Sequence, residues 1–82
     1  MEEIELLRKE IDRIDTELTA LLCERFDAAR EIGALKRAAG IERYDPARER
    51  AIMEATEAAC NRYRAQLRRV YQEIFAVSKT LD

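Results

Sequence analysis

The sequence predicts an all-α fold with three helices per chain, one long and two shorter, assembled as an intertwined antiparallel homodimer. Composition predicts the helices: the 82 residues include only two glycines and one proline, and Ala, Leu, Glu and Arg are abundant. The length predicts an additional source of stability. A chain this short buries little of its own surface and usually needs disulfides, a metal or a partner chain. A long heptad pattern in the first half indicates that this partner is a second copy.

The first predicted helix spans about residues 3 to 38. Its apolar residues recur at alternating spacings of three and four, which is a heptad pattern, and Arg25 interrupts it. This apolar seam consists of Ile4, Leu7, Ile11, Ile14, Leu18, Leu21, Ala28, Ile32 and Leu35. The helix would be roughly 50 Å long, longer than a domain of this size is wide, so the seam requires a second copy of itself.

Two shorter helices follow. Gly40 is expected to end the first helix, and Asp45 as N-cap with Pro46 at the first helical position begins the second, over about residues 46 to 60. A break near Asn61 separates it from the third, over about residues 64 to 81. The apolar residues of the third helix are Leu67, Val70, Tyr71, Ile74, Val77 and Leu81. Residues 1–82 are interpreted as a single domain.

Composition also limits the function. The net charge of −2 leaves no basic excess for binding nucleic acid. The chain has no histidine, the commonest zinc ligand and general base, and the one possible pair of cysteines, Cys23 and Cys60, makes no disulfide framework. The acidic N-terminus is unlike a signal peptide, and no apolar run approaches membrane-spanning length. We expect a cytoplasmic protein without a structural zinc site.

Three cations lie on or beside the apolar seam: Arg25 on it, and Arg8 and Lys36 next to it. A single such cation would usually extend its charged end to solvent or fix the register of a helix pair. Three together are harder to explain in this way, because Asp15 is the only acidic residue on the same stripe of the helix. The cations therefore indicate a binding site for an anion.

The spacing of these cations indicates a site shared between two chains. Arg25 and Lys36 are roughly 16 Å apart along the helix and nearly on one face, whereas Arg8 is roughly 42 Å from Lys36. In an antiparallel pair of first helices, Arg8 of one chain falls opposite the region of Ile32 of the other. A twofold dimer would then form two identical sites for a small polyanion, most simply a dicarboxylate.

The first turn of the second helix adds a weaker signal. Asp45 is fully explained as an N-cap, and Glu49 suits the positive end of the helix dipole. Arg48 opposes that dipole, so it is the residue of this turn that indicates a function.

These residues together resemble the all-helical chorismate mutase family, without a gap from about residue 4 to 53. The resemblance rests on Leu7-Arg8, Ile11, Ile14-Asp15, Leu18, Leu21-Leu22, Glu24-Arg25, Ala29, Ile32-Gly33, Lys36, Asp45-Pro46 and Arg48-Glu49. It implies an isomerase that rearranges chorismate to prephenate in the biosynthesis of phenylalanine and tyrosine. It also implies a homodimer with shared active sites and no cofactor.

The resemblance implies a role for each matched residue. Arg25 of one chain and Arg8 of the other would bind the two substrate carboxylates. Lys36 would donate a hydrogen bond to the ether oxygen of the breaking bond and touch a carboxylate. Glu49 would accept a hydrogen bond from the substrate hydroxyl, and Arg48 would add positive charge at the entrance.

Three further positions come from the connection before the second helix and from the third helix. Asp45 would contact the hydroxyl region through its backbone, and Ser78 would lie near a carboxylate. One turn after the Ser78 position the family usually has Gln or sometimes Glu as a second donor to the ether oxygen, and here that position is Asp82. An ionised Asp82 would oppose the charge that develops there, so we expect a modest enzyme.

Three alternatives stay open at this point. An isochorismate-pyruvate lyase of the same fold shares most of the cations and is separated from a mutase only by its products. A non-catalytic helical dimer module is disfavoured by three cations without matching acids. A weakly active enzyme that depends on a partner enzyme is the third.

Overall fold

The computed structural model describes all 82 residues and contains helices and no strands, so the predicted all-α class is confirmed. The elements are α1 (Glu2–Ala39), α2 (Pro46–Ala59), the short 3-10 helix η1 (Asn61–Tyr63) and α3 (Arg64–Ser78). The predicted bounds of α1 and α2 lie within one residue of those observed. The break predicted near Asn61 is the start of η1.

Local signals at the link between α1 and α2 act as the sequence predicts. Gly40 adopts the left-handed conformation (φ 69°), and the N–H of Ile41 donates to the carbonyl of Lys36 at 2.8 Å. A residue with a Cβ would be strained at Gly40, so glycine ends α1 at this point. The side chain of Asp45 accepts a hydrogen bond from the N–H of Arg48 at 3.0 Å and caps α2.

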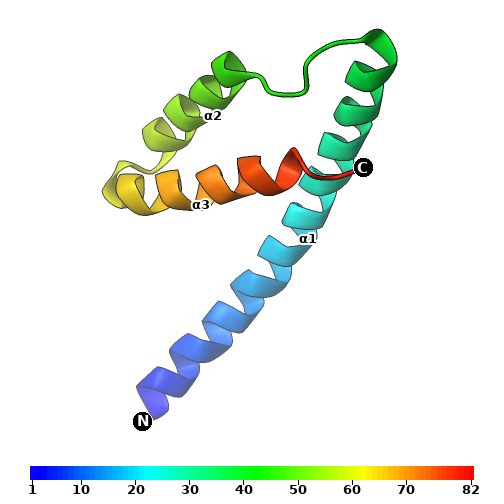
Figure 1. Ribbon diagram of the computed structural model, residues 1–82. Coiled ribbons are helices and arrows are strands. Elements are labelled where there is room, and N and C mark those ends of the chain that lie inside the picture. The colour runs from blue at the N-terminus through cyan, green and yellow to red at the C-terminus, as the bar shows by residue number, and fades with distance from the viewer.

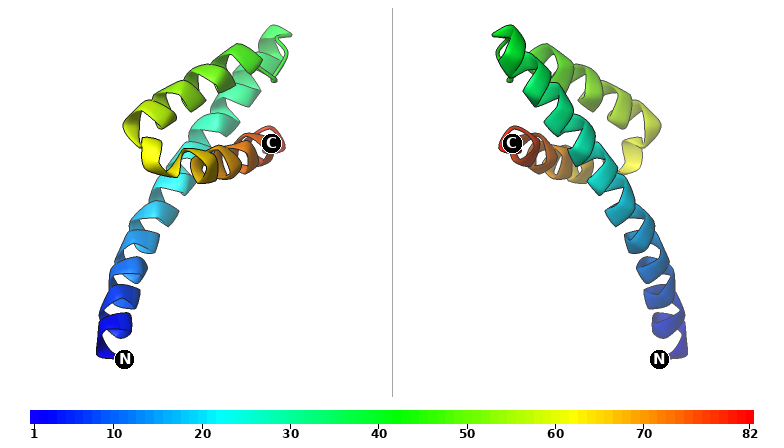
Figure 2. Two further views of the ribbon diagram at one scale, coloured as in Figure 1. Left: turned by 90° about the vertical axis from the view of Figure 1, so that its left-hand side faces the viewer. Right: turned by 90° about the vertical axis from the view of Figure 1, so that its right-hand side faces the viewer.

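The three helices are not packed into one bundle. η1 joins α2 and α3 into a hairpin beside the C-terminal half of α1, while the N-terminal half of α1 projects away from both (Figures 1 and 2). The extents are 56 × 24 × 16 Å and the radius of gyration is 16.0 Å. A compact chain of this length has a radius of gyration of about 12 Å. The chain by itself is therefore far more extended than an ordinary small domain.

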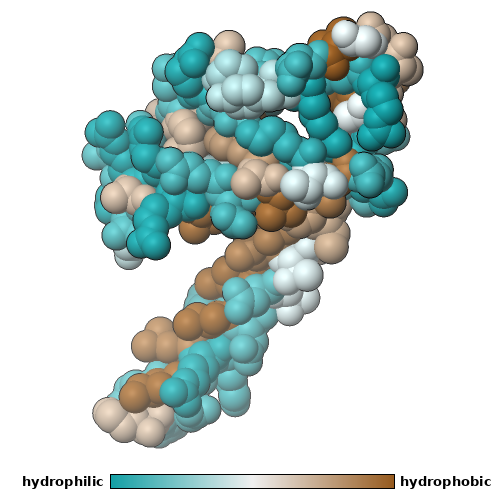
Figure 3. Space-filling model, in the orientation of Figure 1, coloured by the Kyte–Doolittle hydropathy of each residue, from teal (hydrophilic) through white to brown (hydrophobic).

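The apolar seam is exposed along this projecting half. Figure 3 shows a stripe of apolar side chains on it, and Leu7 and Leu21, for example, are 63% and 61% exposed. The chain exposes 6836 Å², whereas a compact monomer of its mass exposes about 5,000 Å². Only Gly33 and Phe75 are buried. The seam thus remains available to another apolar surface.

The predicted end of the third helix needs a correction, since α3 ends at Ser78 and not near residue 81. The guanidinium of Arg43 donates to the carbonyl of Ser78 at 2.8 Å and also to the carbonyl of Leu81. These bonds satisfy one carbonyl of the last turn of α3 and one beyond it, and Arg43 also donates to the carbonyl of Ala29 on α1. The carbonyl of Asp82 then accepts from the side chain of Arg30. No helix of the chain combines the length and the apolar character that crossing a membrane requires.

Candidate active site

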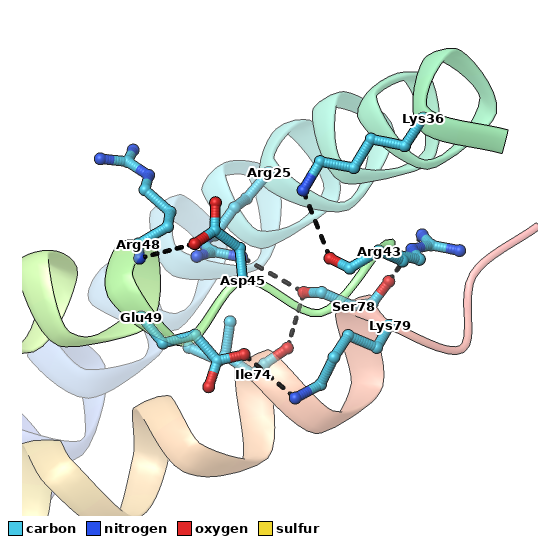
Figure 4. Close-up of polar contacts among 9 residues, drawn as sticks. All are labelled: Arg25, Lys36, Arg43, Asp45, Arg48, Glu49, Ile74, Ser78 and Lys79. Carbon is cyan, nitrogen blue, oxygen red and sulfur yellow. Dashed lines mark hydrogen bonds and ion pairs between the residues drawn. The ribbon is translucent and has the colours of Figure 1, made fainter. Parts of the chain in front are cut away.

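A cavity of about 290 Å³ lies where the C-terminal half of α1, the start of α2 and the end of α3 meet. Six of the eight residues that the sequence indicated line it. They are Arg25, Lys36, Asp45, Arg48, Glu49 and Ser78. Residues that are 53 positions apart in the chain are thus brought to one place, as Figure 4 shows.

Arg25 is the cation that interrupts the apolar seam, and its side chain turns toward α3. Its Nη1 donates to the hydroxyl of Ser78 at 3.2 Å, and its guanidinium lies 5.9 Å from the ring centroid of Phe75. The Ser78 hydroxyl in turn donates to the carbonyl of Ile74 at 2.6 Å. Since Ser78 is a neutral partner, the charge of Arg25 is not cancelled by it and remains available to an anion.

Lys36 approaches the cavity from the same face of α1 three turns later. Its ammonium donates to the backbone carbonyl of Arg43 at 3.4 Å, a long contact near the limit for a hydrogen bond. An ammonium has three donors, so at least two of the donors of Lys36 are free for a ligand.

The first turn of α2 supplies the opposite wall. The side chain of Asp45 accepts from the N–H of Arg48 and caps α2, as the sequence predicted. The guanidinium of Arg48 makes no ion pair or hydrogen bond, so this cation lines the cavity without a protein partner. The carboxylate of Glu49 is paired, and its Oε2 lies 3.0 Å from the ammonium of Lys79.

Sequence reasoning missed Arg43 and Lys79, which also line the cavity. The guanidinium of Arg43 donates to the carbonyls of Ala29, Ser78 and Leu81 and so joins α1 to the end of α3. It packs against Gly33, where an added Cβ would lie 2.6 Å from the guanidinium carbon. A glycine inside a long helix is the signal that could have indicated such a close approach.

Two of the indicated residues lie outside the cavity. Arg8 lies on the projecting half of α1, and its exposed guanidinium pairs with Glu5 at 2.9 Å. Asp82 does not follow Ser78 on a helical turn, which corrects the position expected for it. Its side chain is 97% exposed and lies 3.7 Å from Arg37.

The cavity is electropositive. Five cations and two carboxylates line it, which leaves three more positive than negative charges. The cations are Arg25, Lys36, Arg43, Arg48 and Lys79, and the carboxylates are Asp45 and Glu49. The site can therefore bind a small polyanion and stabilise negative charge that develops on a bound oxygen.

Comparisons with known proteins agree with this chemistry. The family model described as chorismate mutase type II matches residues 7–82. A bifunctional chorismate mutase/prephenate dehydratase of Aquifex aeolicus is 52% identical over 54 residues, which are 66% of this chain and 15% of that protein. A chorismate mutase of Methanocaldococcus jannaschii is 32% identical over 63 residues, 77% of this chain and 64% of that protein.

An intracellular chorismate mutase of Mycobacterium tuberculosis is 40% identical over 52 residues, 63% of this chain and 50% of that protein. The matched segment thus spans less than two thirds of each of these three relatives. No solved structure gives a significant match. Because the family model covers most of α1 and the whole of α2 and α3, the chain belongs to the chorismate mutase type II family.

Proposed function

We propose that this chain is an isomerase that rearranges chorismate to prephenate in the biosynthesis of phenylalanine and tyrosine. The observation that carries the proposal is the convergence of Arg25, Lys36 and Arg48 from two helices on one cavity. Chorismate carries two carboxylates, which suits a cavity with an excess of positive charge. The volume of about 290 Å³ is near the lower limit for small-molecule sites, about 300 Å³.

The reaction requires positioning and a cation, and these residues supply both. The rearrangement is intramolecular, so holding the enolpyruvyl arm over the ring provides an orientation effect of several kcal/mol. Negative charge grows on the ether oxygen as its bond to the ring breaks. An ammonium placed there in advance typically contributes roughly 3 kcal/mol. We assign that role to Lys36, whose ammonium on α1 has at least two free donors.

The carboxylates and the hydroxyl have their own partners in this proposal. Arg25 binds one carboxylate, beside the hydroxyl of Ser78. Glu49 accepts from the substrate hydroxyl, near the backbone of Asp45, and Arg48 adds positive charge at the mouth of the cavity. Asp82 lies outside the cavity, so we assign it no role at the ether oxygen.

We further propose that the active form is an antiparallel dimer in which Arg8 of the partner completes each cavity. The exposed seam supports this, because the chain exposes roughly 1,800 Å² more than a compact monomer, and a standard interface buries about 800 Å² per partner. Arg8 is roughly 42 Å from Lys36 along the same helix and can reach a cavity only in another chain.

The names of the relatives support the product and the location. The Aquifex aeolicus protein is named for a mutase and a prephenate dehydratase in one chain, which agrees with prephenate as the product. The Mycobacterium tuberculosis protein is named as intracellular, which supports the proposed cytoplasmic location.

The test is to mix the purified chain with chorismate, follow the loss of its ultraviolet absorbance, and assay prephenate and pyruvate separately. We expect prephenate in an amount equal to the chorismate consumed. The Lys36→Ala variant should lose at least about a hundredfold in kcat. Formation of pyruvate in place of prephenate would assign the chain to the lyase reaction, and no turnover at all would contradict an independent enzyme.

A further inference from the structure

Lys79 follows the last residue of α3, and its ammonium lies between Glu49 of the cavity wall and the ring of Tyr44. It is 3.0 Å from Oε2 of Glu49 in the first turn of α2 and 4.5 Å from the ring centroid of Tyr44 in the preceding link. Figure 4 shows Lys79 extending from the end of α3 toward Glu49. An ion pair and a cation–π contact thus fix one side chain between α3 and the start of α2.

Glu49 presents an electrostatic problem in a cavity that binds a dianion. An ionised carboxylate on the wall repels the substrate carboxylates, and the repulsion is strong at short range in a partly desolvated site. The other carboxylate of the cavity, Asp45, is already engaged by the N-terminus of α2. Lys79 is the only cation that forms an ion pair with Glu49.

The geometry of the pair leaves Glu49 usable. Lys79 contacts Oε2, whereas Oε1 of Glu49 takes part in no hydrogen bond. A carboxylate held through one oxygen can still accept a hydrogen bond through the other. The orientation of Glu49 is then fixed by Lys79 before any ligand arrives.

We infer that Lys79 is a positioning residue for the reaction: it cancels the charge of Glu49 and holds it so that Oε1 accepts from the substrate hydroxyl. The inference rests on the proposed function of the cavity. The inference goes beyond the proposed function because it assigns a part of the substrate affinity to Lys79, which the sequence did not indicate. Lys79 itself then touches Glu49 and not the substrate.

A purely structural role is a poor explanation for this contact. The side chains of Lys79 and Glu49 are 37% and 26% exposed, and ion pairs exposed to this degree contribute little to stability. Removing the ammonium should therefore leave the fold intact and change the charge of the cavity.

The experiment measures KM and kcat for chorismate in the full chain. Lys79→Met should raise KM roughly tenfold, because Glu49 is left uncompensated, and lower kcat by less. Lys79→Arg keeps the charge and should stay within about threefold of the wild type. Arg69→Met, which removes an exposed cation of α3 that does not line the cavity, is the matched control and should change neither constant.

The decisive variant is the double substitution Lys79→Met with Glu49→Gln. If Lys79 acts by cancelling the charge of Glu49, removing that charge should return KM to within about threefold of the value for Glu49→Gln alone. A KM that stays as high as in Lys79→Met would show that Lys79 binds the substrate directly and would overturn the inference. An unchanged KM in Lys79→Met would also overturn it, while leaving the mutase assignment in place. A wild-type chain without turnover would instead remove the proposed function, and this inference with it.

Discussion

At the scale of single residues, the contact between Gly33 and Arg43 fixes much of the geometry of the cavity. Gly33 is one of two buried residues, and the guanidinium of Arg43 occupies the space where a Cβ would lie. From there it bonds to three backbone carbonyls on α1 and at the end of α3. The carbonyl of Arg43 also accepts from Lys36. The guanidinium of Arg43 thus links α1, which carries Arg25 and Lys36, to α3, which ends at Ser78.

This contact predicts that the effect of Gly33→Ala changes sign with the residue at position 43. In the wild type the new methyl group displaces the Arg43 guanidinium, and the lost hydrogen bonds should lower the free energy of unfolding by roughly 1–3 kcal/mol. In an Arg43→Ala background nothing is displaced, and alanine should stabilise the helix relative to glycine by up to about 1 kcal/mol. Urea denaturation of the four proteins measures both effects. Destabilisation of equal size in both backgrounds would show that Arg43 is not the cause.

At the scale of elements, the sequence predicted what local chemistry determines and missed what tertiary contacts determine. The heptad pattern predicted α1, and the Asp45-Pro46 pair predicted the start of α2 to the residue. The end of α3 was placed too late, because its apolar pattern continues to Leu81 while Arg43 binds the carbonyl of Ser78, which would accept from the N–H of Asp82 in a further turn. Such a side-chain contact between distant segments leaves no periodic signal in the sequence.

The candidate site shows the same division. Residues on regular elements with unusual charge, such as Arg25 and Lys36, could be recognised from their positions on the helix. Lys79 could not be recognised in this way, because its contact with Glu49 depends on how the end of α3 meets the start of α2. Arg8 was indicated by the pattern, but it lies outside the cavity of its own chain, and its proposed role requires the proposed partner.

The N-cap of α2 yields a prediction at this scale. Asp45→Ala should lower the free energy of unfolding by about 1 kcal/mol, since the N–H of Arg48 loses its acceptor. Asp45→Asn keeps an acceptor oxygen at the same place and should retain most of the stability. Thermal or urea unfolding of both variants at one protein concentration is the measurement. Equal stability of Asp45→Ala and the wild type would contradict the capping role.

At the scale of the whole molecule, the uneven distribution of contacts is the dominant feature. The C-terminal half of α1 contacts the end of α3, and its N-terminal half projects away from both shorter helices (Figure 2). We therefore expect the folded protein to sediment as a dimer and to have no stable folded monomer. A compact monomer in sedimentation would contradict both the dimer and the shared site.

The shared site predicts complementation between inactive chains. Arg8→Ala and Lys36→Ala homodimers should each be nearly inactive, because each lacks one cation in both cavities. In a mixed dimer one cavity receives both defects and the other receives neither, so a purified mixed dimer should have about half of the wild-type activity. Differently tagged chains, exchanged and separated, allow the measurement. Absence of activity in a verified mixed dimer would show that Arg8 does not act across the interface.

The exposed half of α1 also has a consequence during synthesis. These residues leave the ribosome before α2 and α3 exist, and neither of those helices covers the seam afterwards. A nascent chain thus presents an apolar stripe that α2 and α3 leave unshielded and that a second chain covers in the proposed dimer, and neighbouring ribosomes on one messenger supply such chains at high local concentration. We expect pairing to begin between nascent chains, so that slow initiation of translation would lower the yield of native protein more than slow elongation would.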